Sequence, residues 1–517
     1  MASIERTAYP RFKRAVPVRE LHEALTPAAG EIAWAREQTR TPEHMLALVV
    51  LLKSCQRLGY FPALAEVPSP VAEHIRGILE LKPDVQAGHD SDRTLRQHKS
   101  LVRARLGITA DPGRAREVAG QAIRAAARAK DNPADLINVA LEELVRARLE
   151  LPAYGTVDEL AASIRAEVNT AVFAGIAARM TPEDAQVIDG LLKVDPVRRR
   201  SDFDRLKTVA PAASVQRFKD HLKHMAWLGS LGAADTWLAG VPPAKVVHFA
   251  GEARVTDAAD LRRYAPEKKR ALVAALIHTA RVRARDEIAT MFCKRMAAIH
   301  KRARERLEQL HEETRAESER LLDTFGEVLA GVREALGVSP GEQDSGTADA
   351  TEEVCARAGR LVLGALGQAG GVAALSAAHE TVTAHHGNNY LPLVERFCRS
   401  SRPALFGVLE VLVLRSASAD TSLLDAVRFL RASHGRTGEY IPAHQDGKEI
   451  DLSFAPEAWR KIVTDQRRPD RLVSRHFEAC VFSCLATELR SGDIAVAGSE
   501  SYANFADQLL SWEECEP

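Results

Sequence analysis

Two stretches of the chain gather cationic side chains at spacings that suit contact with phosphate groups. In the first, residues 91–105 (SDRTLRQHKSLVRAR), five Lys or Arg residues stand against one Asp. As one short helix, this stretch turns its apolar residues inward and its cations outward together. Such a local field suits a nucleic-acid backbone better than a small anion, although a solvated helix face has the same pattern. The candidate contacts are Arg93, Arg96, His98, Lys99 and Arg103.

The second stretch contains VDPVRRRSDFDRLK (194–207) and continues through three further cations. Residues 193–223 hold nine Lys or Arg against four Asp, and we expect a pair of basic helices here. These cations are predicted to clamp DNA backbone, with a solvated surface as the alternative. The candidate residues are Arg198, Arg199, Arg200, Arg205 and Lys207, followed by Arg217, Lys219 and Lys223.

A third candidate is a helical pair, residues 32–39 and 43–58, joined by the short turn TRTP. Lys53, Gln56 and Arg57 share one side of the second helix, as in a helix-turn-helix reader of the major groove. Gln and Arg make paired contacts to adenine and guanine edges. Any helical hairpin with a polar face gives the same pattern. Arg36 and Arg40, in and after the first helix, complete the candidate DNA contacts.

Metal and nucleophile chemistry are not predicted. His476, Cys480 and Cys484 lie at i, i+4 and i+8 of one expected helix, which places the outer two about 12 Å apart, too far to share a zinc ion. His385 and His386 near Cys398 lack paired ligand spacing. The sequence contains no GxSxG, HExxH, GxxxxGK[ST] or GxGxxG motif. We therefore expect no catalytic residue, metal ligand or cofactor.

Composition indicates a globular protein of several domains. The chain has 517 residues, 70 Lys and Arg against 70 Asp and Glu, 46% hydrophobic residues and 27% charged residues. The zero net charge removes any global argument for nucleic acid but leaves local basic patches possible. No apolar run is long enough to span a membrane, and no secretory signal is recognised at the start. Seven scattered cysteines favour reduced thiols in a cytoplasm.

The elements that must position these side chains are helices. Ala and Leu dominate, apolar residues recur at spacings of three and four, and Pro and Gly fall between the runs. We predict an all-α multidomain array, with short strands only around GEYIP and GDIAVAG. The expected parts are 1–110, 111–180, 181–265, a long helical scaffold or dimerisation segment at 266–337, a linker at 338–353, and 354–517.

Three segments together resemble the Tn-three family of replicative, cointegrate-forming transposases. The first, residues 34–75, contains LKSCQRLGYFP followed by VPSPVAEHI, and the second contains RTLRQHKSLVRARLGI followed by LEELVRARLELPAYGTVDEL. The third, residues 476–510, contains LRSGDIAVAGSESYANFADQLL. Each segment is similar to a run found in that family. In order and spacing, the three extend over nearly the whole chain.

The resemblance implies binding to the terminal inverted repeats of a transposon, with the long helices as scaffold and dimer-forming parts. The family's RNase H-like domain, whose Asp-Asp-Glu triad holds divalent metals, follows the LRSGDI segment, whereas this sequence stops soon after it. We therefore expect a chain truncated before catalysis, bacterial, cytoplasmic and nucleoid-associated, a possible homodimer, and not bound to membranes. The alternatives are half of a split transposase acting with a separate catalytic chain, and a helical scaffold or regulatory remnant without specific DNA binding.

Overall fold

The protein is mainly α-helical, as predicted, with 69% of residues in helices and 5% in strands. The structure, a computed structural model, describes residues 3–13, 15–197, 199–208, 215–337, 351–385, 387–435, 438–445 and 448–509. Two compact units divide the chain. The first comprises Met1–Thr208 and Leu231–Thr279, and the second comprises Val209–Ser230 and Ala280–Pro517. Each unit is described by itself.

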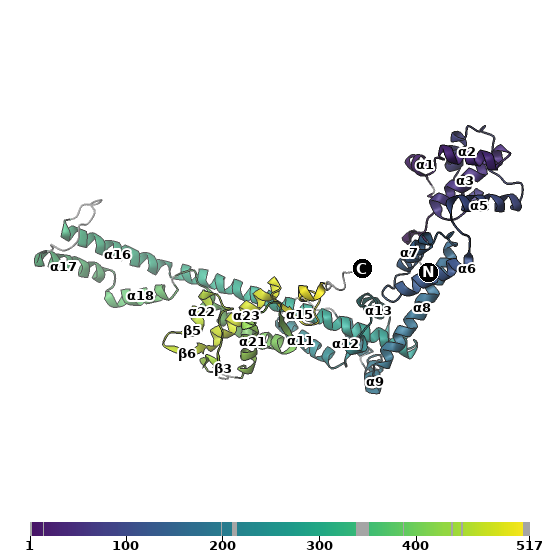
Figure 1. Cartoon of the computed structure of the whole chain (residues 1–517). Coiled ribbons are helices and arrows are strands. Elements are labelled where there is room, and N and C mark those ends of the chain that lie inside the picture. Colours follow the sequence, from purple (N-terminus) through teal and green to yellow (C-terminus); the bar gives the residue numbers. More distant parts are fainter. Residues whose placement is uncertain are drawn as a thin grey trace. The chain divides into compact units, whose positions relative to one another are not determined.

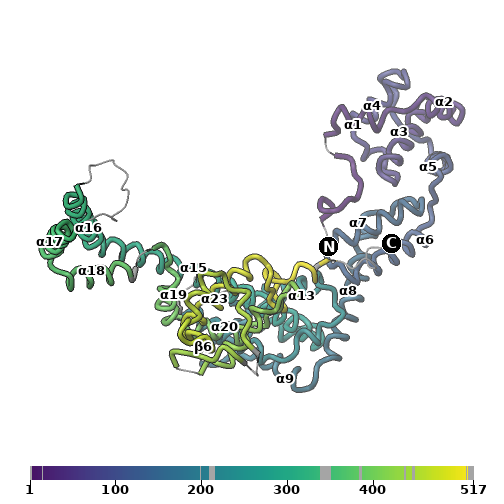
Figure 2. Tube along the Cα trace, turned by 60° about the vertical axis from the view of Figure 1, so that its left-hand side comes forward, coloured from purple at the N-terminus to yellow at the C-terminus, as the bar shows by residue number. Residues whose placement is uncertain are grey.

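The first unit opens with a bundle built around one buried helix (Figures 1 and 2). Helix α3 is apolar all round, so its residues from Met45 to Cys55 are buried beneath the neighbouring helices. The Thr41 hydroxyl caps its start by accepting from the amide of His44, and Gly59, with φ of 74°, ends it in the left-handed conformation. The bundle comprises α1 (Val18–Ala24), α2 (Ala29–Gln38), α3 (Pro42–Leu58), α4 (Ser69–Ile78) and α5 (Asp92–Leu106).

A second bundle of three helices follows, α6 (Pro112–Ala126), α7 (Pro133–Arg146) and α8 (Tyr154–Ala178). It is joined to the first by backbone pairing, since the Thr109 amide donates to the Arg148 carbonyl and the Leu151 amide donates to the Gly59 carbonyl. The LPAYGT segment forms this joint. The Tyr9 hydroxyl donates to the Pro152 carbonyl at 2.8 Å.

The rest of the first unit is a run of shorter helices that leads into a long one. These are α9 (Pro182–Leu191), α10 (Asp202–Leu206), α12 (Ala234–Trp237), α13 (Pro243–Val255), α14 (Ala258–Leu261) and the first part of α15 (Pro266–Glu313). The basic helices expected around residues 194–207 are wrong in part, because Val194 and Ser201 pair as an antiparallel bridge and a turn joins them. Asp195 holds this turn by accepting the Val197 amide on its side chain.

The second unit packs helices around α23 (Ser474–Ser491), whose face from Phe477 to Leu485 is buried. Glu478 accepts both Nε and Nη2 of Arg402, at 2.8 and 2.9 Å. The long stretch expected at 266–337 is two helices, α15 and α16 (Arg315–Leu336), with a break at Thr314. The other helices are α11 (Val215–Gly229), α17 (Glu352–Gln368), α18 (Val372–His385), α19 (Leu391–Cys398), α20 (Arg402–Val411), α21 (Ser422–Ala432) and α22 (Glu457–Val463).

The strands of the second unit are short and antiparallel. Both predicted positions contain one, β2 (Tyr440–Pro442) at GEYIP and β7 (Ile494–Val496) at GDIAVAG. β7 pairs with β1 (Leu414–Ser416), and β2 lies at the edge of a three-stranded sheet in the order β2-β6-β5. The remaining strands, which the sequence analysis did not predict, are β3 (His444–Gln445), β4 (Lys448–Glu449), β5 (Thr464–Asp465) and β6 (Arg468–Val473).

Candidate nucleic-acid interface

Helix α5 presents a continuous polar stripe to solvent. Arg93, Arg96, Gln97 and Ser100 are all exposed, and their spacing of i, i+3, i+4 and i+7 places them on one helix face. Neither arginine has a carboxylate partner within the described part of the chain; Arg96 donates only to the Asp92 carbonyl. Ser91 caps the helix by accepting the Thr94 amide. Gln97 and Ser100 were missed in the sequence analysis, although their spacing from Arg93 could have found them.

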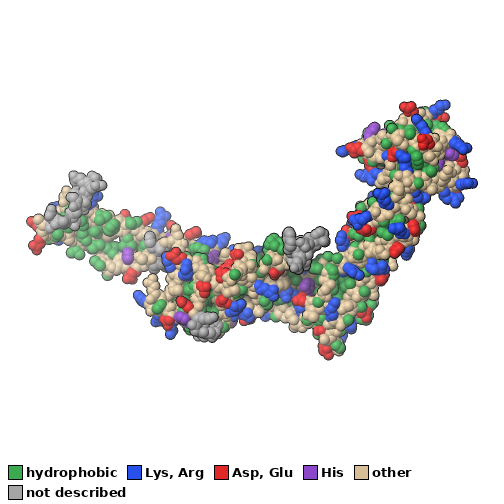
Figure 3. All heavy atoms as spheres, viewed as in Figure 1, with side chains coloured by type: hydrophobic (Ala, Val, Ile, Leu, Met, Phe, Trp, Pro, Cys, Tyr) green, Lys and Arg blue, Asp and Glu red, His purple; other side chains and the backbone are tan. Residues whose placement is uncertain are grey.

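The turn between α2 and α3 lies beside the start of α5. His44 Nε2 is 3.0 Å from Asp90 Oδ2, which joins the first turn of α3 to the residues just before α5. Arg36 and Arg40 are exposed on the segment leading into that turn and have no carboxylate partner among residues whose structure is described. Lys and Arg side chains are spread over these N-terminal helices in the space-filling view (Figure 3).

The inner side of α5 is different. The His98 side chain is 4% exposed, and its Nδ1 lies 3.1 Å from Nε2 of His89, so it is part of the core rather than a DNA contact. Burial, with the neighbouring histidines, lowers the pKa of His98 to about 4. Lys99 and Arg103 are half-buried over the Phe61 ring, and Arg103 also pairs with Glu150 at 2.8 Å.

The three candidate base readers on α3 are held by carboxylates. Lys53 is 8% exposed and donates to Glu31 at 3.3 Å, and Gln56 donates to the same carboxylate at 2.7 Å. Arg57 pairs with Glu20 at 2.9 Å. Burial raises the pKa of Glu31, but its hydrogen bonds and the Lys53 charge outweigh that effect and hold the pKa below its usual value. The structure therefore argues against α3 as a groove-reading helix: it is the central core helix of the bundle.

The second basic stretch divides between the two units. Arg199 and Arg200 are exposed on the turn between α9 and α10, where Arg199 has φ of 50°, whereas Arg198 lies outside the described residues. Arg205 is exposed on α10, and Lys207 is half-buried, donating to the Thr256 carbonyl at 2.8 Å. Arg217, Lys219 and Lys223 belong to α11 in the second unit.

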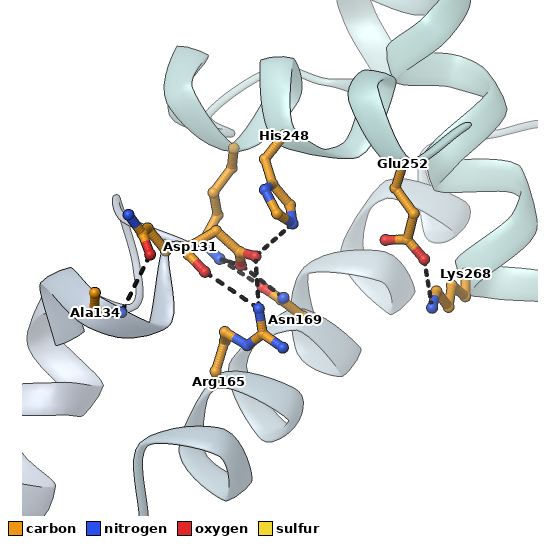
Figure 4. Close-up of polar contacts among 9 residues, drawn as sticks. Asp131, Ala134, Arg165, Asn169, His248, Glu252 and Lys268 are labelled. Carbon is orange, nitrogen blue, oxygen red and sulfur yellow. Dashed lines mark hydrogen bonds and ion pairs between the residues drawn. The ribbon is translucent and has the colours of Figure 1, made fainter. Parts of the chain in front are cut away.

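A buried polar network joins α7, α8 and α13 in the first unit (Figure 4). Asp131 lies just before α7, and both its oxygens are satisfied: Oδ1 accepts from Asn169 at 2.7 Å and Lys245 at 3.0 Å. Oδ2 is 2.7 Å from His248 Nε2 and 3.5 Å from Arg165 Nη1. Lys245 is fully buried. The sequence analysis missed this network because its members are up to 117 positions apart (248 − 131).

No metal site emerges among the residues whose placement is described, since no group of three or more His, Cys, Asp or Glu could hold an ion there. Cys480 and Cys484 are buried free thiols, and their hydrogen bond, with burial, raises the pKa of Cys480. His386 and the side chain of His385 lie outside the described residues. Of the described helices, none alone is long and apolar enough to cross a membrane, although α17 and part of α18 pass that test as a pair bent by 68°.

The fold and this surface define a mainly helical protein with arginine-bearing external helices. Residues 1–164 match a family model described as a domain of unknown function, DUF4158. The chain is 24% identical over 491 residues to the transposase for transposon Tn2501 of Escherichia coli, and 24% identical over 493 residues to that for Tn501 of Pseudomonas aeruginosa. Each match covers 92% of this chain and 46% of the relative.

A shorter match is stronger. Over 130 residues, 25% of this chain and 12% of the relative, the chain is 32% identical to the transposase for transposon Tn3926 of Escherichia coli. The chain spans about half the length of the curated relatives that it matches along most of its sequence. These findings confirm the resemblance to the Tn-three family: the chain corresponds to the N-terminal and middle regions of its transposases.

Proposed function

We propose that this chain acts in DNA transposition by binding the terminal inverted repeats of a transposon, and that α5 is its reading helix. The observation that carries the proposal is the exposed stripe of Arg93, Arg96, Gln97 and Ser100, whose arginines have no carboxylate partner within the described residues. Arginine makes two parallel hydrogen bonds to guanine, and glutamine does so to adenine. The similarity to transposases supports the DNA end as the target.

Other cations position the chain on the duplex. Arg36 and Arg40 lie on the segment that the His44–Asp90 contact holds beside α5, and they would contact phosphates. Arg199 and Arg200, on their exposed turn, would clamp backbone elsewhere. Lys53, Gln56, Arg57 and His98 are not part of the proposed surface, because internal partners or burial already hold them.

The test is a binding titration of the full chain against a duplex carrying the terminal repeat of its own element and a scrambled duplex of equal composition. It is run at two salt concentrations, because each phosphate contact contributes about 0.9 to the slope of log affinity against log salt. We expect the terminal repeat to bind at least about 10³-fold more tightly than the scrambled duplex. Equal, weak binding to both would overturn specific recognition, and binding without any salt dependence would favour the scaffold alternative.

Two substitutions at one position separate base reading from charge. Arg96→Lys keeps the charge but loses the paired geometry, so it should weaken binding to the terminal repeat while leaving the salt slope unchanged. Arg96→Ala should lose about 1–3 kcal/mol of binding free energy and relax specificity. The matched control is Arg19→Ala, on exposed α1, where the arginine pairs with Glu23. If Arg19→Ala weakens binding as much as Arg96→Ala does, α5 is not the reader.

A further inference from the structure

A pocket opens on the outer side of the Asp131 network. It has a volume of about 620 Å³ and is lined by α8 and α13, together with Lys268 from the first turn of α15. Its polar lining includes Arg165, Asn169, His248, Glu252 and Lys268. Figure 4 shows these side chains converging from separate helices, with Glu252 and Lys268 paired to one side at 2.8 Å.

The network beneath the pocket is closed. Asp131 accepts two contacts on each oxygen, and fully buried Lys245 donates to both Asp131 and Asn169. A carboxylate satisfied in this way presents little free negative charge to a ligand, because its lone pairs are already directed at donors. The acid is therefore a support that holds the cations, and it does not itself face an incoming group.

The outer layer is cationic and retains free donors. Arg165 uses only Nη1 in its contacts with Asp131, and 31% of its side chain is exposed. His248 uses Nε2, and 42% of its side chain is exposed, which leaves Nδ1 for another partner. Lys268 is 35% exposed. With Lys245, three permanent cations stand against two carboxylates, Asp131 and Glu252, so the site has a positive excess even when His248 is neutral.

We propose that this pocket binds a phosphate group, held by the free nitrogens of Arg165, by His248 and by Lys268, and that the phosphate belongs to the DNA backbone. A guanidinium with two unused nitrogens and an adjoining ammonium are the groups that proteins use for phosphate. The assignment of the source to DNA rests on the proposed function. The phosphate chemistry itself does not, since an inorganic phosphate ion or a nucleotide presents the same oxygens.

The test places a carboxylate in the pocket without removing any contact of the network. Ala166 lines the pocket on α8 and is exposed, so Ala166→Glu adds a negative charge beside Arg165. Ala171→Glu is the matched control, because Ala171 is exposed on the same helix and does not line the pocket. Lys268→Gln is a second variant that removes a lining cation. Each full-length variant is titrated with inorganic phosphate, against chloride at equal ionic strength, and with the terminal-repeat duplex.

We expect phosphate to raise the melting temperature of the wild type and Ala171→Glu more than that of Ala166→Glu or Lys268→Gln. We also expect Ala166→Glu to lower DNA affinity roughly tenfold and the salt slope by about 1. Phosphate stabilisation lost in Ala166→Glu with unchanged DNA affinity would overturn the DNA source. Equal phosphate responses in both glutamate variants would overturn the pocket. Phosphate binding that depends on the pocket in a chain that binds no DNA would leave the pocket standing and refute the proposed function.

Discussion

Two neighbouring helices of the N-terminal bundle use their cations in opposite ways. On α3, Lys53 and Arg57 are paired with Glu31 and Glu20, and these contacts tie the core helix to its neighbours. On α5, Arg93 and Arg96 face solvent without a carboxylate partner in the described structure. The difference shows that a basic residue at helical spacing indicates a nucleic-acid surface only when no acidic side chain from another helix reaches it. The Asp131 network extends the first behaviour to a fully buried lysine.

The largest effect should follow from breaking that network. Asp131→Ala leaves buried Lys245 without its carboxylate and crowds it against Arg165 and His248, so we expect a loss of about 3–5 kcal/mol in the free energy of unfolding. Urea denaturation measures it. Asp131→Asn, which keeps the shape and one acceptor oxygen, serves as the comparison and should cost less. A change below 1 kcal/mol for Asp131→Ala would show that the network contributes little to the fold.

A smaller loss is expected from Glu31, the corresponding carboxylate beside α3. Glu31→Ala removes the partner of buried Lys53, the acceptor for Gln56 and the cap of the Ala28 amide, so about 2–4 kcal/mol of stability should be lost. The measurement is again urea denaturation, now with the salt slope of DNA binding recorded in parallel. An unchanged slope is expected, because these side chains are internal. A steeper slope would mean that freed Lys53 or Gln56 reaches phosphate.

The buried side of α5 gives a prediction in pH. His98 has a pKa of about 4 in the fold, against an ordinary value of 6.5, so it is neutral when folded and takes up a proton on unfolding. The unfolded chain therefore binds more protons between these two values, and stability falls as the pH is lowered from 6.5 to 4. The histidine accounts for a loss on the order of 2 kcal/mol. Burial lowers the pKa values of His89 and His74 as well, in the same direction.

The measurement compares urea midpoints at pH 7 and pH 4.5 for the wild type and His98→Gln. Carboxylates also begin to titrate near the lower pH, so the difference between the two proteins isolates the histidine. A wild type and a variant that lose equal stability on acidification would contradict the assignment.

Much of the fold could be predicted because it depends on local pattern. The apolar spacing of residues 43–58 and the TRTP turn predict α2 and α3 within a few residues, and the two strand positions at residues 440–442 and 494–496 follow from short β-favouring runs between turn residues. The site was less predictable. Spacing could place Arg93 and Arg96 on one outer face, but the Lys53–Glu31 pair joins residues 22 positions apart on different helices. Local pattern carries no information on that partner.

The smallest effect on stability is expected where the α5 stripe is exposed. Arg93→Ala and Arg96→Ala remove side chains with no carboxylate partner in the described structure, and exposed positions of this kind usually change stability by less than about 0.5 kcal/mol. The free energies of unfolding, measured in urea, should therefore match the wild type. DNA affinity should fall in the same proteins.

This pairing of readouts sharpens the comparison between α3 and α5. A residue whose substitution costs stability and leaves the salt slope unchanged belongs to the class of Lys53. One whose substitution leaves stability unchanged and weakens binding belongs to the class proposed for Arg96. If Arg96→Ala instead destabilises the chain by more than 1 kcal/mol, its contact with the Asp92 carbonyl is structural. The stripe on α5 would then be a stabilising surface like the α3 pairs, and the arginines before and after it would have to supply the DNA contacts.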